Sequence, residues 1–171
     1  MSNSEKKSAQ IIAIDARKVR ATEGGNEAHK PGRYGYRVAG CGFLASEQVP
    51  SEVVIAPVIF PVPKAPEWLL GLANLHGTIV PVFDLWKFIR TQMPERAACT
   101  VLIFNPGDAA VGLVVDSLPK PVPRDSQALH SPPPLPVLSP FLGAGVHAFG
   151  SEWWEFDYRQ FLAHLSAVDS R

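Results

Sequence analysis

One stretch, Pro66 to Leu85 with the sequence PEWLLGLANLHGTIVPVFDL, constrains the fold of this chain more than any other. A segment suited to a strand, Leu72 to His76, is followed by Gly77, which offers a turn, and then by the run Thr78 to Asp84. Alternate residues of that run fall on opposite faces of a strand, and both faces are largely apolar. Pro81 cannot donate a ladder hydrogen bond, so it indicates a sheet edge, a bulge or a place where one sheet gives way to another. The stretch predicts two strands joined by a tight turn.

Similar strand signals recur along the chain at short intervals. Alternation and turn residues predict three further hairpins, over residues 34–44, 100–115 and 146–156. Short β-branched runs at 53–55 and 58–60 are interrupted by prolines, which suits edge strands and corners. Many short strands with frequent turns predict an all-β barrel or a pair of barrels.

Two segments near the C-terminus differ in the regular structure that their sequences predict. The proline-dense segment Pro119 to Pro140 predicts an extended connector with little regular hydrogen bonding. Asp157 and Gln160 have the spacing of a helix-capping pair, and they are followed by a C-terminal helix. Its apolar residues share one face at spacings of three and four: Tyr158, Phe161, Leu162 and Leu165. Leu85 to Ile89 is expected to form a single helical turn.

The first 33 residues differ from the rest in composition. Residues 15–33 mix charges with glycine and proline, and such a segment cannot bury enough apolar surface to fold alone. We therefore expect a flexible N-terminal arm over residues 1–33, although the isoleucines within Ile11 to Ile14 could dock on the body. With 171 residues and 46% hydrophobic content, the remainder suits one domain or two small packed lobes.

Charge and cysteine usage narrow the function classes. Lys plus Arg and Asp plus Glu number 16 each, so the chain has no excess positive charge of the kind that binds nucleic acid. The apolar run Ile11 to Ile14 is too short for a signal-peptide core or a membrane span, so we expect a cytoplasmic protein without membrane insertion. Cys41 and Cys99 imply no disulfide framework.

Catalytic and metal-binding motifs find little support in the sequence. Neither a nucleophile elbow, a phosphate-binding glycine loop nor a zinc-protease helix is present, and the five histidines show no ligand spacing with either cysteine. We therefore predict no enzyme activity, cofactor or metal. Asp84 and Asp116 each end an apolar strand, where a carboxylate usually caps the next turn. The four tryptophans suit either core packing or interface anchors.

The central stretch resembles the signature of the chemotaxis coupling proteins with a CheW-like domain. The residues that carry the resemblance are Pro66, Gly71, Leu72, Asn74-Leu75-His76-Gly77, Ile79-Val80, Pro81-Val82 and Asp84-Leu85. A second family element, Val-Gly-Leu-Val-Val-Asp, occurs at Val111 to Asp116. The resemblance implies a CheW-like domain over residues 34–167, made of two small packed five-stranded β-barrels of SH3-like form with a short C-terminal helix.

The resemblance also implies a function. Proteins of this family are non-catalytic adaptors that link the cytoplasmic tip of methyl-accepting chemoreceptors to the regulatory domain of a CheA-type histidine kinase. Carried over position by position, the implied partner-binding residues are Gly71, Asn74, His76 and Gly77. Asp84 is expected to be structural. The wording of the signature also resembles variants that accompany chemosensory pathways controlling type IV pilus motility, and both this output and flagellar chemotaxis stay open.

His76 stands where the family has an arginine, so an imidazole ring replaces an always-charged planar guanidinium. Three explanations of this replacement stay open. The protein couples to a different receptor or kinase, it has lost ordinary coupling and serves as an accessory scaffold, or the position is not critical in this chain. A further alternative is a small β-barrel enzyme or ligand-binding protein with a pocket near Cys99 and His76.

Overall fold

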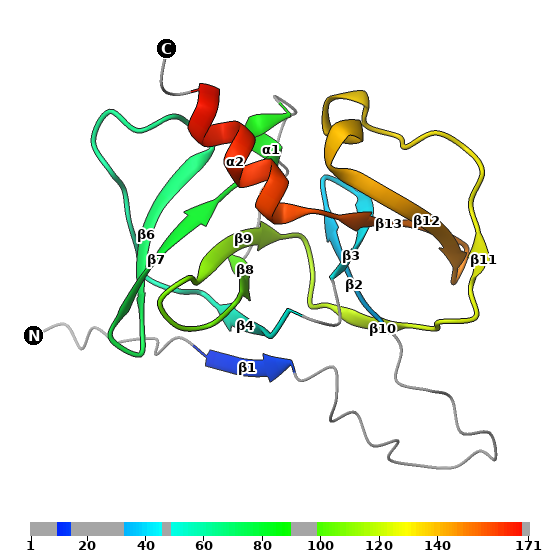
Figure 1. The fold of residues 1–171 in the computed structure, drawn as a ribbon. Coiled ribbons are helices and arrows are strands. Elements are labelled where there is room, and N and C mark those ends of the chain that lie inside the picture. Colours follow the sequence, from blue (N-terminus) through cyan, green and yellow to red (C-terminus); the bar gives the residue numbers. More distant parts are fainter. Residues whose placement is uncertain (1–9, 15–32, 46–48, 90–98, 169–171) are drawn as a thin grey trace, which may run out of the picture. The chain divides into compact units, whose positions relative to one another are not determined.

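The computed structural model describes residues 10–14, 33–45, 49–89 and 99–168, which form two compact units (Figure 1). Each unit combines two separate parts of the chain. Of the described residues, the first contains 10–14, 50–89 and 99–118, and the second contains 33–45, 49 and 119–168. None of the helices in these ranges is long and apolar enough to cross a bilayer.

The first unit is a curled seven-stranded sheet with the strand order β1-β4-β8-β9-β7-β6-β5. Its elements in chain order are β1 (Gln10–Ile14), β4 (Ser51–Ile55), β5 (Ile59–Phe60), β6 (Leu69–Leu75), β7 (Thr78–Phe83), α1 (Leu85–Phe88), β8 (Thr100–Phe104) and β9 (Val111–Val115). One face of the sheet buries a cluster of small and β-branched side chains, as the alternation of the sequence predicts. The buried cluster contains Val54, Ala73, Leu75, Val80, Val82, Val101, Ile103, Ala110 and Val114.

The second unit is a curled six-stranded sheet with the order β10-β2-β3-β13-β12-β11, completed by two helical segments. Its elements are β2 (Arg33–Val38), β3 (Cys41–Ala45), β10 (Lys120–Val122), β11 (Gln127–Ala128), the 3-10 helix η1 (Pro136–Phe141), β12 (Leu142–Ala148), β13 (Ser151–Phe156) and α2 (Tyr158–Val168). A buried cluster on one face comprises Leu44, Val122, Val146, Ala148 and Trp153.

The C-terminal helix α2 begins and packs as its sequence predicts. The backbone N–H of Gln160 donates to Oδ1 of Asp157 at 2.9 Å, so Asp157 caps the helix. Phe161 meets the ring of Phe141 edge-on at 5.3 Å between centroids and lies 5.6 Å from Phe156. These aromatic contacts fix α2 against η1 and the end of β13.

The prediction of an all-β fold with two small β-barrels and a short C-terminal helix is confirmed, since the protein is mostly β, with two curled sheets that form half-barrels and a short C-terminal helix. The sheets have seven and six strands rather than five each, because short strands extend their edges. Two of these strands, β10 and β11, lie in the proline-dense segment and occupy opposite edges of the six-stranded sheet. The prediction that this segment holds little regular hydrogen bonding is therefore wrong at these places. An edge strand forms ladder hydrogen bonds on one side only. Pro121, which lacks a backbone N–H, is therefore tolerated within β10.

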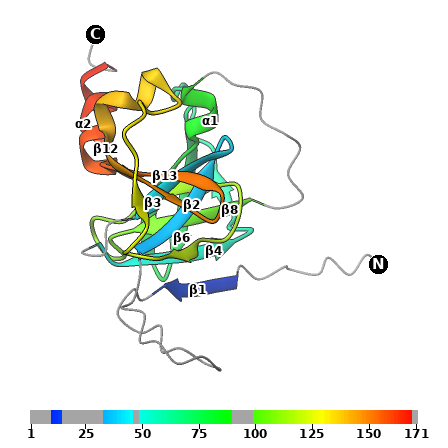
Figure 2. The ribbon, with the colours of Figure 1, turned by 90° about the vertical axis from the view of Figure 1, so that its right-hand side faces the viewer.

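The prediction of a flexible arm over residues 1–33 is wrong for residues 10–14, which form β1. This strand pairs with β4 in antiparallel fashion from Gln10 opposite Ile55 to Ile14 opposite Ser51 (Figures 1 and 2). The edge of β4 would otherwise present unpaired backbone groups, and pairing with β1 satisfies them. The rest of the predicted arm up to residue 32 lies outside the described residues.

Candidate partner-binding surface

The β6–β7 hairpin ends in a two-residue turn formed by His76 and Gly77. Leu75 pairs with Thr78, and both turn residues have positive φ, 52° at His76 and 88° at Gly77. Such turns match the right-handed twist of the strands that they join. The backbone N–H of Gly77 donates to the side-chain oxygen of Asn74 at 3.0 Å, which fastens the turn to β6. The sequence-predicted turn is therefore present, and Asn74 has a structural part in it.

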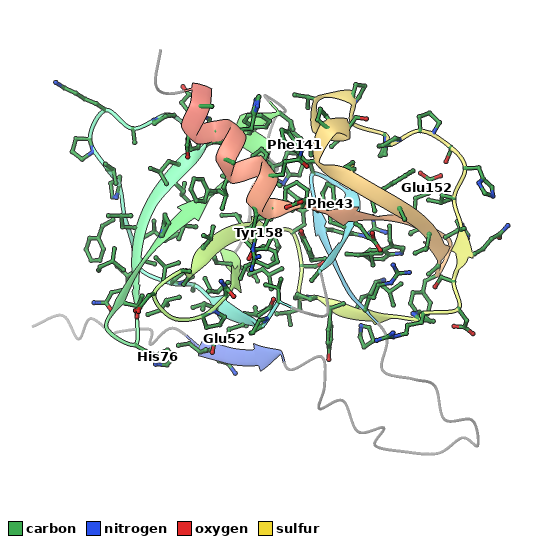
Figure 3. The ribbon with its side chains drawn as sticks, viewed as in Figure 1. Phe43, Glu52, His76, Phe141, Glu152 and Tyr158 are labelled. Carbon is green, nitrogen blue, oxygen red and sulfur yellow. The ribbon has the colours of Figure 1, made fainter. Side chains whose placement is uncertain are left out.

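His76 projects from this turn into solvent at the end of the hairpin (Figure 3). A left-handed backbone conformation is uncommon for residues other than glycine, but histidine, asparagine and aspartate are enriched there several-fold. The histidine that replaces the family arginine is therefore a residue well suited to this backbone. Its side chain is available to a partner without disturbing the core.

Gly71 does not belong to the exposed surface. It is buried, its φ is 148°, and a Cβ built on it would lie 2.3 Å from the carbonyl oxygen of Phe60. This close approach brings the short strand β5 against β6. Of the four predicted partner-binding residues, Asn74, His76 and Gly77 lie together and exposed, whereas Gly71 holds the backbone of the same hairpin in place.

An exposed apolar area adjoins the turn on one face of β5, β6 and β7. Ile79 lies directly opposite Asn74 and is 58% exposed. In the next row Phe60 pairs with Leu72, which pairs with Pro81, and Phe60 is 62% exposed. Directly opposed residues share a face of a sheet, so these side chains form one surface. The surface defined by Phe60, Leu72, Asn74, Ile79 and Pro81 is called the hairpin face below.

Sequence reasoning placed Ile79 and Pro81 on one face of their strand but did not identify that face as exposed. The available signal was that both faces of the strand are apolar, whereas the buried cluster takes up only the face that carries Val80 and Val82. The pairing with Phe60 depends on β5, which lies nine residues before β6 and is only two residues long. Periodicity in one segment cannot reveal such a partner.

Asp84 has the structural role that the sequence predicts. It is 1% exposed, its Oδ1 accepts from the backbone N–H of Trp86 at 3.0 Å, and it caps the short helix α1. The tryptophans divide between two environments. Trp153 and Trp154 are buried in the second unit, whereas Trp68 is partly buried and stacks on Phe83 at 5.8 Å.

A pocket shared by Cys99 and His76 is contradicted by the strand register. Cys99 directly precedes β8, whereas the turn at His76 directly precedes β7. Strand β7 runs parallel to β9, and β9 runs antiparallel to β8 with Val111 opposite Phe104. The starts of β7 and β8 therefore lie at opposite ends of the sheet. Within the described ranges, moreover, no three His, Cys, Asp or Glu side chains come together as metal ligands would.

The fold and the hairpin face define a small, mostly β protein with an exposed apolar surface on one hairpin. Comparison with known proteins specifies the family. The CheW-like domain family matches residues 48–152 of the chain. Protein PilI of Pseudomonas aeruginosa is 30% identical over 138 residues, which make up 79% of this chain and 77% of that protein.

Two further relatives agree with this assignment. Protein FrzA of Myxococcus xanthus is 29% identical over 99 residues, 48% of this chain and 62% of that protein. The crystal structure of the scaffolding protein TtCheW from Thermoanaerobacter tengcongensis shares the fold with a TM-score of 0.57 and 23% identity, covering 72% of this chain and 86% of that chain. The chain belongs to the CheW-like family of chemotaxis coupling and scaffold proteins, and the resemblance predicted from the signature is confirmed.

Proposed function

We propose that this protein is a non-catalytic signalling adaptor that couples methyl-accepting chemoreceptors to a CheA-type histidine kinase in the cytoplasm. Membership of the CheW-like family supports coupling as the activity. Similarity to PilI over 79% of the chain supports a pathway that controls type IV pilus motility. The pocket alternative near Cys99 and His76 has no support, since the register separates the two residues.

The observation that carries the proposal is the hairpin face beside its fastened turn. An adaptor needs a surface held at fixed geometry rather than a reactive group. The hydrogen bond between Asn74 and Gly77 fixes the turn, and the buried Gly71 fixes β5 against β6. Protein interfaces commonly combine an apolar centre with a polar rim, and here Phe60 and Ile79 would form the centre.

In this proposal Asn74, His76 and Gly77 contact the partner or shape the backbone that does, and Gly71 acts only by positioning. The turn supplies polar groups at the rim, where contacts govern partner choice and orientation more than affinity. The apolar part of the hairpin face supplies most of the affinity, because fully desolvated anchors dominate binding energy. The partner that docks here is the receptor tip or the kinase regulatory domain.

The decisive experiment is a titration of the full chain against two partners, the regulatory domain of the CheA-type kinase and a receptor cytoplasmic-tip fragment. The variant Ile79→Glu places a charge in the middle of the hairpin face, and we expect it to weaken binding of one partner about tenfold or more. Val137→Glu is the matched control, since Val137 is 49% exposed and belongs to the second unit.

The results of this titration distinguish an error in the proposed function from an error in the proposed binding surface. If the unchanged chain binds neither partner, the adaptor function is wrong. If it binds both, and Ile79→Glu binds as well as the control, the function stands and the hairpin face is not the surface used. Circular dichroism on each variant checks that the fold is retained.

A further inference from the structure

A second exposed surface lies at one end of the six-stranded sheet. Strands β3 and β13 are parallel, with Trp153 paired to Gly42, so the turns that precede them lie at the same end. These are the β2–β3 turn at Ala39 and Gly40 and the β12–β13 turn at Phe149 and Gly150. Lys120 begins β10 and pairs with Gly35 of β2 on the same sheet.

Two glycines make room for a tryptophan at this end. A Cβ at Gly35 would lie 2.5 Å from the ring of Trp153, and a Cβ at Gly42 would lie 2.9 Å from it. The indole therefore lies flat across β3 and β2, where any side chain would displace it. Its Nε1 donates to the carbonyl oxygen of Ala148 at 3.1 Å. The ring is 1% exposed and fixed in position.

Two cationic side chains lie against this fixed ring. The guanidinium carbon of Arg37 is 4.8 Å from the ring centroid, and the ammonium of Lys120 is 5.2 Å from it. Arg37 also donates to the carbonyl oxygen of Gly40 at 2.6 Å, which orients its guanidinium. Cation–π attraction holds both groups, and within the part of the chain that the structure describes neither cation has a carboxylate partner. Among the described residues the only ion pair joins Arg33 and Glu155.

An exposed aromatic side chain completes the surface. Phe149 is 64% exposed, and its ring centroid is 5.5 Å from the ammonium of Lys120. Its φ is 52°, in a turn position that glycine or asparagine occupies more readily. A large apolar side chain is thus held in solvent on an unfavourable backbone, and such features cluster at binding sites.

We infer that Arg37, Lys120 and Phe149 form a docking surface for an acidic peptide segment of a protein partner. The two cations would receive carboxylates, and an apolar side chain of the segment would pack on Phe149. The oriented guanidinium suits a carboxylate, because its planar donors match the two oxygens. A membrane surface fits less well, since recognition of anionic lipid uses clusters of about four to eight basic residues.

This surface goes beyond the proposed coupling function and shares no residue with the hairpin face. Its three residues lie on separate strands and turns of the second unit, so no local motif marks them in the sequence. The pairing of glycines in β2 and β3 with a tryptophan in β13 is visible only once the register is known.

The test uses the full chain and a fluorescein-labelled peptide of about a dozen residues, rich in Asp and Glu with one Phe and one Leu. A peptide with lysine at every acidic position is the comparison probe. Fluorescence anisotropy should detect binding of the acidic peptide that is at least tenfold tighter than that of the lysine peptide, and it should weaken as salt is raised. Equal binding of the two peptides would overturn the proposal.

Three variants locate the binding. Lys120→Glu should weaken the acidic peptide about tenfold, and Phe149→Asn, which suits the turn, should weaken it about threefold to tenfold. Lys64→Glu makes the same charge change at an exposed site in the first unit and should have no effect. Equal losses at Lys120 and Lys64 would overturn the proposal, because they would reflect net charge alone. Vesicles of phosphatidylserine and phosphatidylcholine form the last arm, and Lys120-dependent vesicle binding without peptide binding would overturn the choice of partner.

Discussion

The indole nitrogen of Trp86 donates a hydrogen bond of 2.8 Å to Oδ1 of Asp116, which ties α1 to the end of β9. The backbone N–H of the same tryptophan donates to Asp84. Two carboxylates from different strands therefore hold one helical turn. Both aspartates follow apolar strands, and the sequence predicts them as structural residues for that reason.

The bond between Trp86 and Asp116 should be measurable in a double-mutant cycle. Trp86→Phe and Asp116→Ala should each lower the free energy of unfolding by about 0.5 to 1.5 kcal/mol, because the bond lies at the surface. The double variant should lose less than the sum, with a coupling of about 0.5 kcal/mol or more. Urea unfolding gives these values, with Asp108→Ala, an exposed aspartate, as control. Full additivity would show that the bond does not contribute.

Gly71 and Gly77 should respond differently to alanine, although both have positive φ. Gly77→Ala meets open space, so only the backbone conformation opposes it, and we expect a loss of about 1 kcal/mol. Gly71→Ala also drives a methyl group into the backbone of Phe60, and we expect a loss of about 2 to 4 kcal/mol. Chemical denaturation of both variants measures the two losses in unfolding free energy. Equal losses in the two variants would contradict the close approach of β5 to β6.

The fold can be predicted from the sequence where one segment contains all the information. The hairpin of β2 and β3 is predicted over residues 34–44 because alternation and a glycine turn are adjacent, and the pair β8 and β9 is predicted on the same grounds. β1 was missed because a five-residue strand is stable only on the edge of β4, which lies far along the chain. The exposed turn at His76 was foreseen, whereas the buried position of Gly71 depends on its contact with Phe60.

Removing β1 should have a larger effect than its sequence suggests. Deletion of residues 1–14 uncovers the edge of β4 and removes the contacts of Ile11 and Ile12, which are 37% and 38% exposed. We expect a loss of about 1 to 2 kcal/mol in unfolding free energy. The uncovered edge should also promote association that rises with protein concentration, measured by light scattering. Deletion of residues 1–9 is the control for a shortened N-terminus. Unchanged stability after deletion of residues 1–14 would show that β1 is not held by β4.

Alkaline pH should destabilise the second unit through Tyr36. Burial raises the pKa of this phenol well above its ordinary value near 10, since desolvation disfavours the charged form. The folded state therefore keeps a proton that the unfolded state releases above pH 10. Stability from this group is complete below pH 10 and falls above it, by up to about 1.4 kcal/mol per pH unit.

The measurement is urea unfolding at pH 8 and at pH 11 for the unchanged chain and for Tyr36→Phe. The variant should show a smaller loss of stability between the two pH values. Tyr34→Phe, on the same strand but only partly buried, is the matched control and should behave like the unchanged chain. An equal loss in all three proteins would assign the alkaline effect to other groups.

The replacement of His76 by arginine bears most directly on function. Arginine restores an always-charged planar group at the tip of the β6–β7 hairpin, next to the hairpin face. Because His76 is exposed and its side chain leaves a turn, the change opens no cavity, and the unfolding free energy should fall by less than about 1 kcal/mol.

If this turn meets a partner, the affinity for that partner should change by about fivefold in the His76→Arg variant, which corresponds to about 1 kcal/mol. The sign of the change in affinity reports the partner's surface, since affinity rises opposite a carboxylate and falls opposite a group adapted to an imidazole ring. Titrations against the kinase regulatory domain and the receptor-tip fragment measure it, with His130→Arg, an exposed histidine of the second unit, as control. Unchanged affinity for both partners would remove His76 from the site and leave Asn74 and Gly77 as builders of the turn alone.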